Sequence, residues 1–172
     1  MKTNLGINDI ADFVLLYCFE NEISISPLKL QKLLYYIQAW HLVYFDKQLL
    51  FEEKPQAWVN GPVYPTIYNR FKGILRYSEL NKENTGLSST TLEDKQQILD
   101  LDKEQYEFLD SIFHHYGMME HDRLVFLTHA ELPWSEKRDG LMPFEPSDNE
   151  ISFETMFNYY NQRMIKNREK KQ

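Results

Sequence analysis

The 172-residue sequence contains one cysteine, Cys18, and therefore cannot form an internal disulfide. It has no apolar run suited to a membrane helix, because its longest apolar region, residues 28–45, is interrupted by Lys29, Lys32 and His41. No apolar signal-peptide core is present at the N-terminus. These absences argue against a disulfide-stapled secreted protein and against a membrane protein. We therefore expect a cytoplasmic protein with no membrane partner.

Positive charge is also scarce, since 19 Lys and Arg residues face 26 Asp and Glu residues, for a net charge of −7. The segment 163–172 holds five basic residues and one acidic one, a net +4, which leaves −11 for the rest. An acidic body repels phosphates, so we expect a poor nucleic-acid binder. A solvated helix end is the favoured interpretation of the basic C-terminal tail, and contact with nucleic acid or an acidic partner is the alternative.

The sequence has no Gly-rich phosphate loop and no Gly-x-Ser-x-Gly elbow, and none of its five histidines has a strong metal-binding spacing. His114, His115 and His121 have Glu120 and Asp122 nearby, and a zinc or iron site is the alternative there to an ordinary polar helix end. We therefore expect no enzyme, no cofactor and no metal.

Two further side chains that could carry chemistry are interpreted as core residues. His41 falls on an apolar helix face, which is typical of a core histidine with a hydrogen-bonded ring. Cys18 has no adjacent base and is interpreted as a small core residue rather than a nucleophile.

Helical spacing of apolar residues dominates the chain. Ser26 as N-cap and Pro27 at the first position start a helix over 27–45 that is apolar on more than one side, which is typical of the centre of a domain. The sequence predicts a mainly α fold: one compact helical domain over 1–172 around this central helix, with one or two short β-strands near 51–63. Further helices are predicted over 8–21, 65–75, 102–117, 122–130 and from Ser152 onward, and another turn begins at Pro133-Trp134 and stops at Gly140.

Between the helices, residues 76–101 turn polar. We expect a mobile excursion there, with a short strand near Leu92 or Ile98 as one possibility.

A second unusual stretch runs from Gln56 to Tyr68 and combines three aromatic residues with two prolines and an Asn-Gly pair. Asn60-Gly61 signals a two-residue hairpin turn, but Pro62 would then stand at the closing position without an N–H, so a tight hairpin is not expected. The favoured interpretation is a rigid structural corner with Trp58 and Tyr68 in the core. The alternative is a stiffened surface that exposes its aromatic side chains to a partner.

Two groups of residues together resemble the Panacea domain family, which includes SocA-like antitoxins and phage-associated GepA-type proteins. One group is Pro27–Tyr36 with Gln38-Ala39-Trp40, and the other is Ala57–Val63. Leu127-Thr128-His129 and Pro133-Trp134 add to the resemblance, which covers the chain from about Ile7 to Tyr160.

The resemblance implies an antitoxin of a bacterial or prophage toxin–antitoxin pair, which neutralises its cognate protein toxin by direct binding. It also implies an alternative, an adaptor that delivers the bound toxin to a Clp-type protease; a small metal-dependent hydrolase is a third hypothesis. Many members carry a DNA-binding domain ahead of this one, which we do not expect here. The toxin-contact residues that we predict are Gln31, Tyr35, Gln38, Trp58, Asn60, Tyr64, His129 and Trp134.

Overall fold

The computed structural model describes residues 4–170. An eighteen-residue helix, α2 (Pro27–Tyr44), runs through the middle of the molecule, and fifteen of its residues are buried. It begins as the sequence predicts, because the Ser26 side chain accepts a hydrogen bond from the backbone N–H of Lys29 and Pro27 occupies the first turn. A helix that is apolar on several sides can bury all of them only at the centre of a domain. The prediction of a central helix is confirmed.

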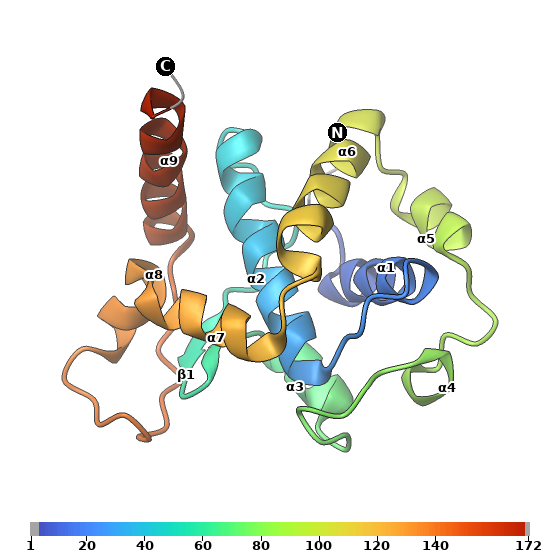
Figure 1. Ribbon diagram of the computed structural model, residues 1–172, viewed down its shortest axis with the longest axis horizontal. Coiled ribbons are helices and arrows are strands. Elements are labelled where there is room, and N and C mark those ends of the chain that lie inside the picture. Colours follow the sequence, from blue (N-terminus) through green and yellow to red (C-terminus); the bar gives the residue numbers. More distant parts are fainter. Residues whose placement is uncertain (1–3, 171–172) are drawn as a thin grey trace.

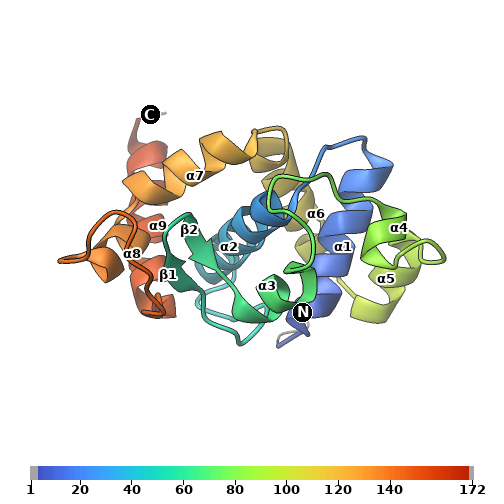
Figure 2. The same cartoon turned by 90° about the horizontal axis from the view of Figure 1, so that it is seen from below.

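The other elements surround α2 (Figures 1 and 2), and the mainly α fold with a minor sheet is confirmed. The helices are α1 (Ile7–Glu20), α3 (Pro65–Phe71), α4 (Lys82–Thr85), α5 (Leu92–Leu99), α6 (Lys103–Ile112), α7 (His121–Ala130), α8 (Leu132–Ser135) and α9 (Phe153–Glu169), with a π-helical turn η1 (Phe113–Gly117) and a 3-10 turn η2 (Glu136–Arg138). The strands β1 (Gln56–Trp58) and β2 (Gly61–Val63) form an antiparallel pair. No helix within residues 4–170 is long and apolar enough to cross a membrane.

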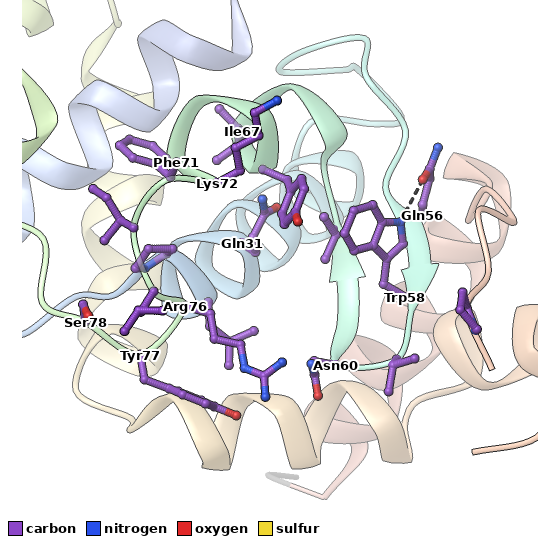
Figure 3. Close-up of a pocket in the computed structure, with 18 of the residues that line it drawn as sticks. Gln31, Gln56, Trp58, Asn60, Ile67, Phe71, Lys72, Arg76, Tyr77 and Ser78 are labelled. Carbon is purple, nitrogen blue, oxygen red and sulfur yellow. Dashed lines mark hydrogen bonds between the residues drawn. The ribbon is translucent and has the colours of Figure 1, made fainter. Parts of the chain in front are cut away.

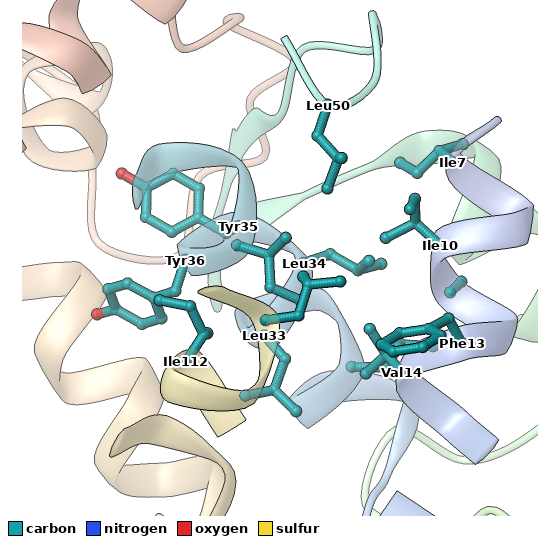
Figure 4. Packing of buried hydrophobic residues seen from close by; sticks show 14 of the residues in the cluster. Ile7, Ile10, Phe13, Val14, Leu33, Leu34, Tyr35, Tyr36, Leu50 and Ile112 are labelled. Carbon is teal, nitrogen blue, oxygen red and sulfur yellow. The ribbon is translucent and has the colours of Figure 1, made fainter. Parts of the chain in front are cut away.

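The core lies where α1 and α6 pack against α2, and Figure 4 shows Leu33 and Leu34 of α2 facing Ile10 and Phe13 of α1. Cys18 belongs to this core and is fully buried, and its burial raises the pKa of the thiol to about 12. The interpretation of Cys18 as a core residue is confirmed.

His41 is also a core residue, as predicted. Its Nδ1 donates a hydrogen bond to the carbonyl oxygen of Gln48 at 2.8 Å, and its ring lies against Phe45 and Phe108. Burial lowers the pKa of the ring, because the apolar surroundings disfavour the charged form. A neutral imidazole is therefore the form that the core accommodates.

The polar segment 76–101 contains two helices, α4 and α5, instead of a strand, so the prediction of a strand near Leu92 or Ile98 is wrong. The Thr91 side chain accepts a hydrogen bond from the backbone N–H of Asp94 and starts α5. Lys95 then donates to both Asp9 (3.1 Å) and Asp12 (2.9 Å) of α1. These contacts attach α5 to α1, and the mobility of the segment stays a prediction.

Helix boundaries elsewhere agree with the sequence to within a few residues. Helices α6 and α9 start where predicted, and the side chains of Asp102 and Ser152 cap them. By contrast, α1 begins at Ile7, one residue ahead of the predicted start at residue 8. The basic tail begins inside α9, and its residues 171–172 lie outside the described part of the chain.

Candidate binding site

The two strands form a tight hairpin, which corrects the prediction that a tight hairpin is disfavoured. Trp58 pairs with Gly61, so Val59 and Asn60 are the two turn residues and Gly61 stands at the closing position. The turn is thus shifted by one residue from the Asn-Gly frame, and the missing N–H of Pro62 does not interrupt its closure.

Two side chains of α2 hold the outer edge of β2. Lys32 Nζ donates to the carbonyl oxygen of Pro62 at 2.8 Å, and the Gln31 amide accepts from the Tyr64 N–H (2.8 Å) and donates to the Tyr64 carbonyl (3.3 Å). Lys32 has no exposed surface, and its burial lowers the pKa of the amine to about 7. A Cβ on Gly61 would lie 2.8 Å from Lys32 Cε, so the hairpin approaches α2 as closely as glycine permits.

The hairpin is held from its other side by side chains of α7, α8 and η2. Trp134 Nε1 donates to the Trp58 carbonyl at 2.9 Å, and an Arg138 amino group donates to the Ala57 carbonyl, also at 2.9 Å. The His129 ring stacks on Trp134 with centroids 3.9 Å apart, and the same ring is hydrogen-bonded to the backbone of Val59. Burial, followed by the positive charges of Lys32 and Arg138, lowers the pKa of His129. We call the three side chains that hold the hairpin from this side, His129, Trp134 and Arg138, the hairpin clamp.

The open face of the hairpin borders a groove of about 1200 Å³, shown in Figure 3. Its walls come from the start of α2, the hairpin, α3, the turn after α3 and the loop before α9. The lining residues are Pro27, Leu28, Gln31, Gln56, Trp58, Val59, Asn60, Val63, Ile67, Tyr68, Phe71, Lys72, Ile74, Leu75, Arg76, Tyr77, Ser78, Pro146, Ser147 and Asp148. The lining is mainly apolar, with amide and charged groups among the apolar side chains, which is the composition typical of binding sites.

The motif residues Trp58 and Tyr68 lie in this groove and not in the core, which corrects the favoured interpretation of these two residues. Trp58 is half-buried and packs edge-on against Tyr68, whose side chain is 46% exposed. The Trp58 indole N–H donates to Gln56 at 2.8 Å (Figure 3). The interpretation of Gly61 and Pro62 as a structural corner agrees with the structure, because both are buried. The stretch thus combines a structural backbone with side chains that line an open groove.

Comparison with known families shows where the chain belongs. The family model described as "Antitoxin SocA-like, Panacea domain" matches residues 30–135, which run from the first turn of α2 to the end of α8. The chain belongs to the Panacea domain family. No curated protein and no solved structure matches the chain. The matched region of the Panacea domain contains the whole hairpin and most of the hairpin clamp, while α1 and α9 lie outside it.

The eight predicted contact residues of this Panacea domain separate into three groups. Tyr35, Gln38 and Tyr64 have no exposed surface, and their contact with a partner stays a prediction. His129 and Trp134 are half-buried within the hairpin clamp. The remaining three line the groove: Gln31, Trp58 and Asn60.

A buried polar cluster, which the sequence did not reveal, joins the Panacea domain to α9. Glu131 is nearly fully buried and accepts hydrogen bonds from Tyr36 (3.0 Å), from Tyr160 (2.6 Å) and from Arg163. Burial raises the pKa of Glu131, although its three partners oppose that shift. Arg163, the first residue of the basic tail, therefore serves to hold α9 against the domain.

The histidines of the Panacea domain are not gathered at one site in the described residues 4–170. Within residues 4–170, no three His, Cys, Asp or Glu side chains are grouped as a metal site would require. His114 bonds to the Asp110 carbonyl one turn earlier, and His121 lies against Tyr77 at the edge of the groove. The hypothesis of a metal-dependent hydrolase thus gains no support from the arrangement of these side chains.

Proposed function

We propose that this chain is an antitoxin that neutralises a protein toxin by binding it directly. The observation that carries the proposal is its membership of a family described as SocA-like antitoxins. The groove supports it, because an open apolar surface with exposed aromatic side chains favours a binding role. The action is stoichiometric: the antitoxin covers a functional surface of the toxin. We place the pair in the bacterial cytoplasm.

Co-expression with the neighbouring gene tests this proposal. The gene next to this one is induced alone and together with the chain, and growth is compared on plates. We expect the neighbour to arrest growth alone, growth to recover when the chain is present, and the two proteins to co-purify as one species. Recovery of growth without any complex between the two proteins would contradict direct neutralisation.

The proposed mechanism is sequestration, and delivery to a Clp-type protease is the competing outcome. Sequestration leaves the toxin intact inside the complex, whereas an adaptor shortens the life of the toxin. The half-life of the toxin is therefore measured after translation is blocked, in cells with and without the Clp protease. We expect the same half-life in both strains. A half-life that the chain shortens only when Clp is present would replace sequestration by delivery.

A further inference from the structure

The groove leaves three large side chains unusually open. Leu75 is 79% exposed, Tyr77 is 50% exposed and Tyr68 is 46% exposed, and all three line the same groove. Single exposed apolar residues are common on protein surfaces, but a group around one concavity is typical of a binding site. The volume of about 1200 Å³ exceeds the range of roughly 300–1,000 Å³ that is usual for small-molecule pockets. A segment of a macromolecule therefore suits the groove better than a metabolite.

The backbone groups around the hairpin are already bonded, which limits the conformation of such a segment. The Ala57 N–H donates to the Asn149 carbonyl at 2.8 Å, so the loop before α9 covers the edge of β1. Gln31 and Lys32 occupy the backbone groups at the end of β2, including both polar groups of Tyr64. The hairpin therefore offers no free edge to an added strand. A helix satisfies its own backbone and is the segment that fits side-chain walls of this kind.

The charged side chains of the groove indicate which charge a partner should carry. Lys72 and Arg76 line the groove, and neither forms an ion pair with any residue between 4 and 170. The described lining contains a single carboxylate, Asp148, so the groove carries a positive excess on a chain whose net charge is −7. The N-terminus of α2 does not offer a donor here, because the Leu28 N–H donates to the Arg76 carbonyl at 3.1 Å. The two side-chain cations are thus the groups that a partner carboxylate would meet.

We propose that the groove receives an amphipathic helix of the toxin, with apolar side chains on one face and a carboxylate beside them. The apolar face packs between Trp58, Tyr68 and Leu75. The carboxylate pairs with Arg76 or Lys72 at the rim. This inference rests on the proposed function, because it places the helix in the toxin.

The first test measures the affinity of purified toxin, the neighbouring gene product, for groove variants of the full chain. Leu75→Asp places a carboxylate among the apolar walls, and Arg76→Glu reverses the charge that faces the partner. Each is expected to weaken binding by at least about tenfold. Ile98→Asp and Arg123→Glu are the matched controls, because Ile98 is 62% exposed outside the groove and Arg123 lies over the Phe126 ring as Arg76 lies over Tyr77. Both controls are expected to bind as the wild type does.

A second test does not depend on the toxin. A random peptide library displayed on phage is selected against the immobilised wild-type protein, and the binders are measured against the same variants. We expect helix-compatible peptides that combine apolar residues with Asp or Glu and that bind Leu75→Asp at least about tenfold more weakly.

The two tests separate the inference from the proposed function. A wild-type chain that does not bind the toxin contradicts the proposed function, and the peptide selection then decides the groove alone. If the toxin binds the groove variants and the controls equally well, the groove proposal fails while the antitoxin function stands. Selection that yields no peptides sensitive to Leu75→Asp also overturns the groove proposal. Circular dichroism of each variant shows whether lost binding reflects lost folding.

Discussion

Lys32 Nζ lies 2.8 Å from the carbonyl oxygen of Pro62 and has no exposed surface. Its pKa falls from an ordinary 10.5 to about 7, because burial disfavours the charged amine. The unfolded chain therefore binds more protons than the folded protein between these two values, and folding becomes more favourable as the pH rises through this window. At pH 7 and below, the folded protein carries the full cost of burying this amine.

Substitution of Lys32 by methionine should remove this pH dependence. Between pH 7 and about 9.5, we expect the free energy of unfolding of the wild type to rise relative to that of Lys32→Met by on the order of 2–3 kcal/mol. Urea denaturation at several pH values measures both. The range stops below the pKa of ordinary tyrosine, because the buried tyrosines oppose ionisation at higher pH. Parallel curves for the two proteins would show that Lys32 is not the source of the rise.

Gly61 should be the least replaceable glycine among those with a positive φ. Its φ is +94°, and a Cβ would lie 2.8 Å from both Lys32 Cε and Thr128 Oγ1. Gly140 has a φ of +78° and no atom within 4 Å of a Cβ, so it serves as the matched control. We expect Gly140→Ala to cost about 1 kcal/mol of stability, and Gly61→Ala to cost at least about 2 kcal/mol more. Equal losses in denaturation would mean that the hairpin does not approach α2 this closely.

The hydroxyl of Tyr160 should contribute measurably to stability, because it donates to the buried carboxylate of Glu131 at 2.6 Å. Tyr160→Phe removes this donor and is expected to cost about 1.5–3 kcal/mol. Tyr44 is 58% exposed and packs only through its ring, so Tyr44→Phe should change stability by less than about 0.5 kcal/mol. Thermal unfolding of the two variants compares them directly. A neutral Tyr160→Phe substitution would contradict the bonding of Glu131.

The thiol of Cys18 should report on opening of the core. It is fully buried, and its pKa of about 12 leaves little thiolate at neutral pH. We expect almost no reaction with a thiol-specific chromogenic reagent in the native protein, and reaction of one equivalent in denaturant. Fast labelling under native conditions would show that α1 does not pack as described.

The central helix could be predicted from local features of the sequence. Ser26 and Pro27 start α2, and apolar residues on several sides of that helix place it at the centre. The frame of the hairpin was not predictable in the same way. Asn60 and Gly61 favour one turn on local grounds, whereas the native turn is fixed by distant groups, Lys32 and Trp134, that bond the strand carbonyls.

The candidate site was only partly predictable for the same reason. Trp58 and Asn60 were found because they stand in a distinctive stretch of sequence. Leu75 and Arg76 were missed, since they lie in a turn with no motif, and a hydrogen bond from the Leu28 N–H to the Arg76 carbonyl brings this turn to the start of α2. The position of Lys32 within an apolar helix is the one sequence signal that indicates a buried polar contact there.

We propose that this protein acts by covering a toxin, not by chemical turnover. The most direct measurement is the residual activity of the purified toxin as increasing amounts of the purified chain are added, read at several incubation times. Stoichiometric binding predicts a fall that ends at one fixed molar ratio and does not change with time. Complete inactivation by far less than one equivalent of the chain, progressing with time, would show that the protein acts by turnover and not by stoichiometric binding.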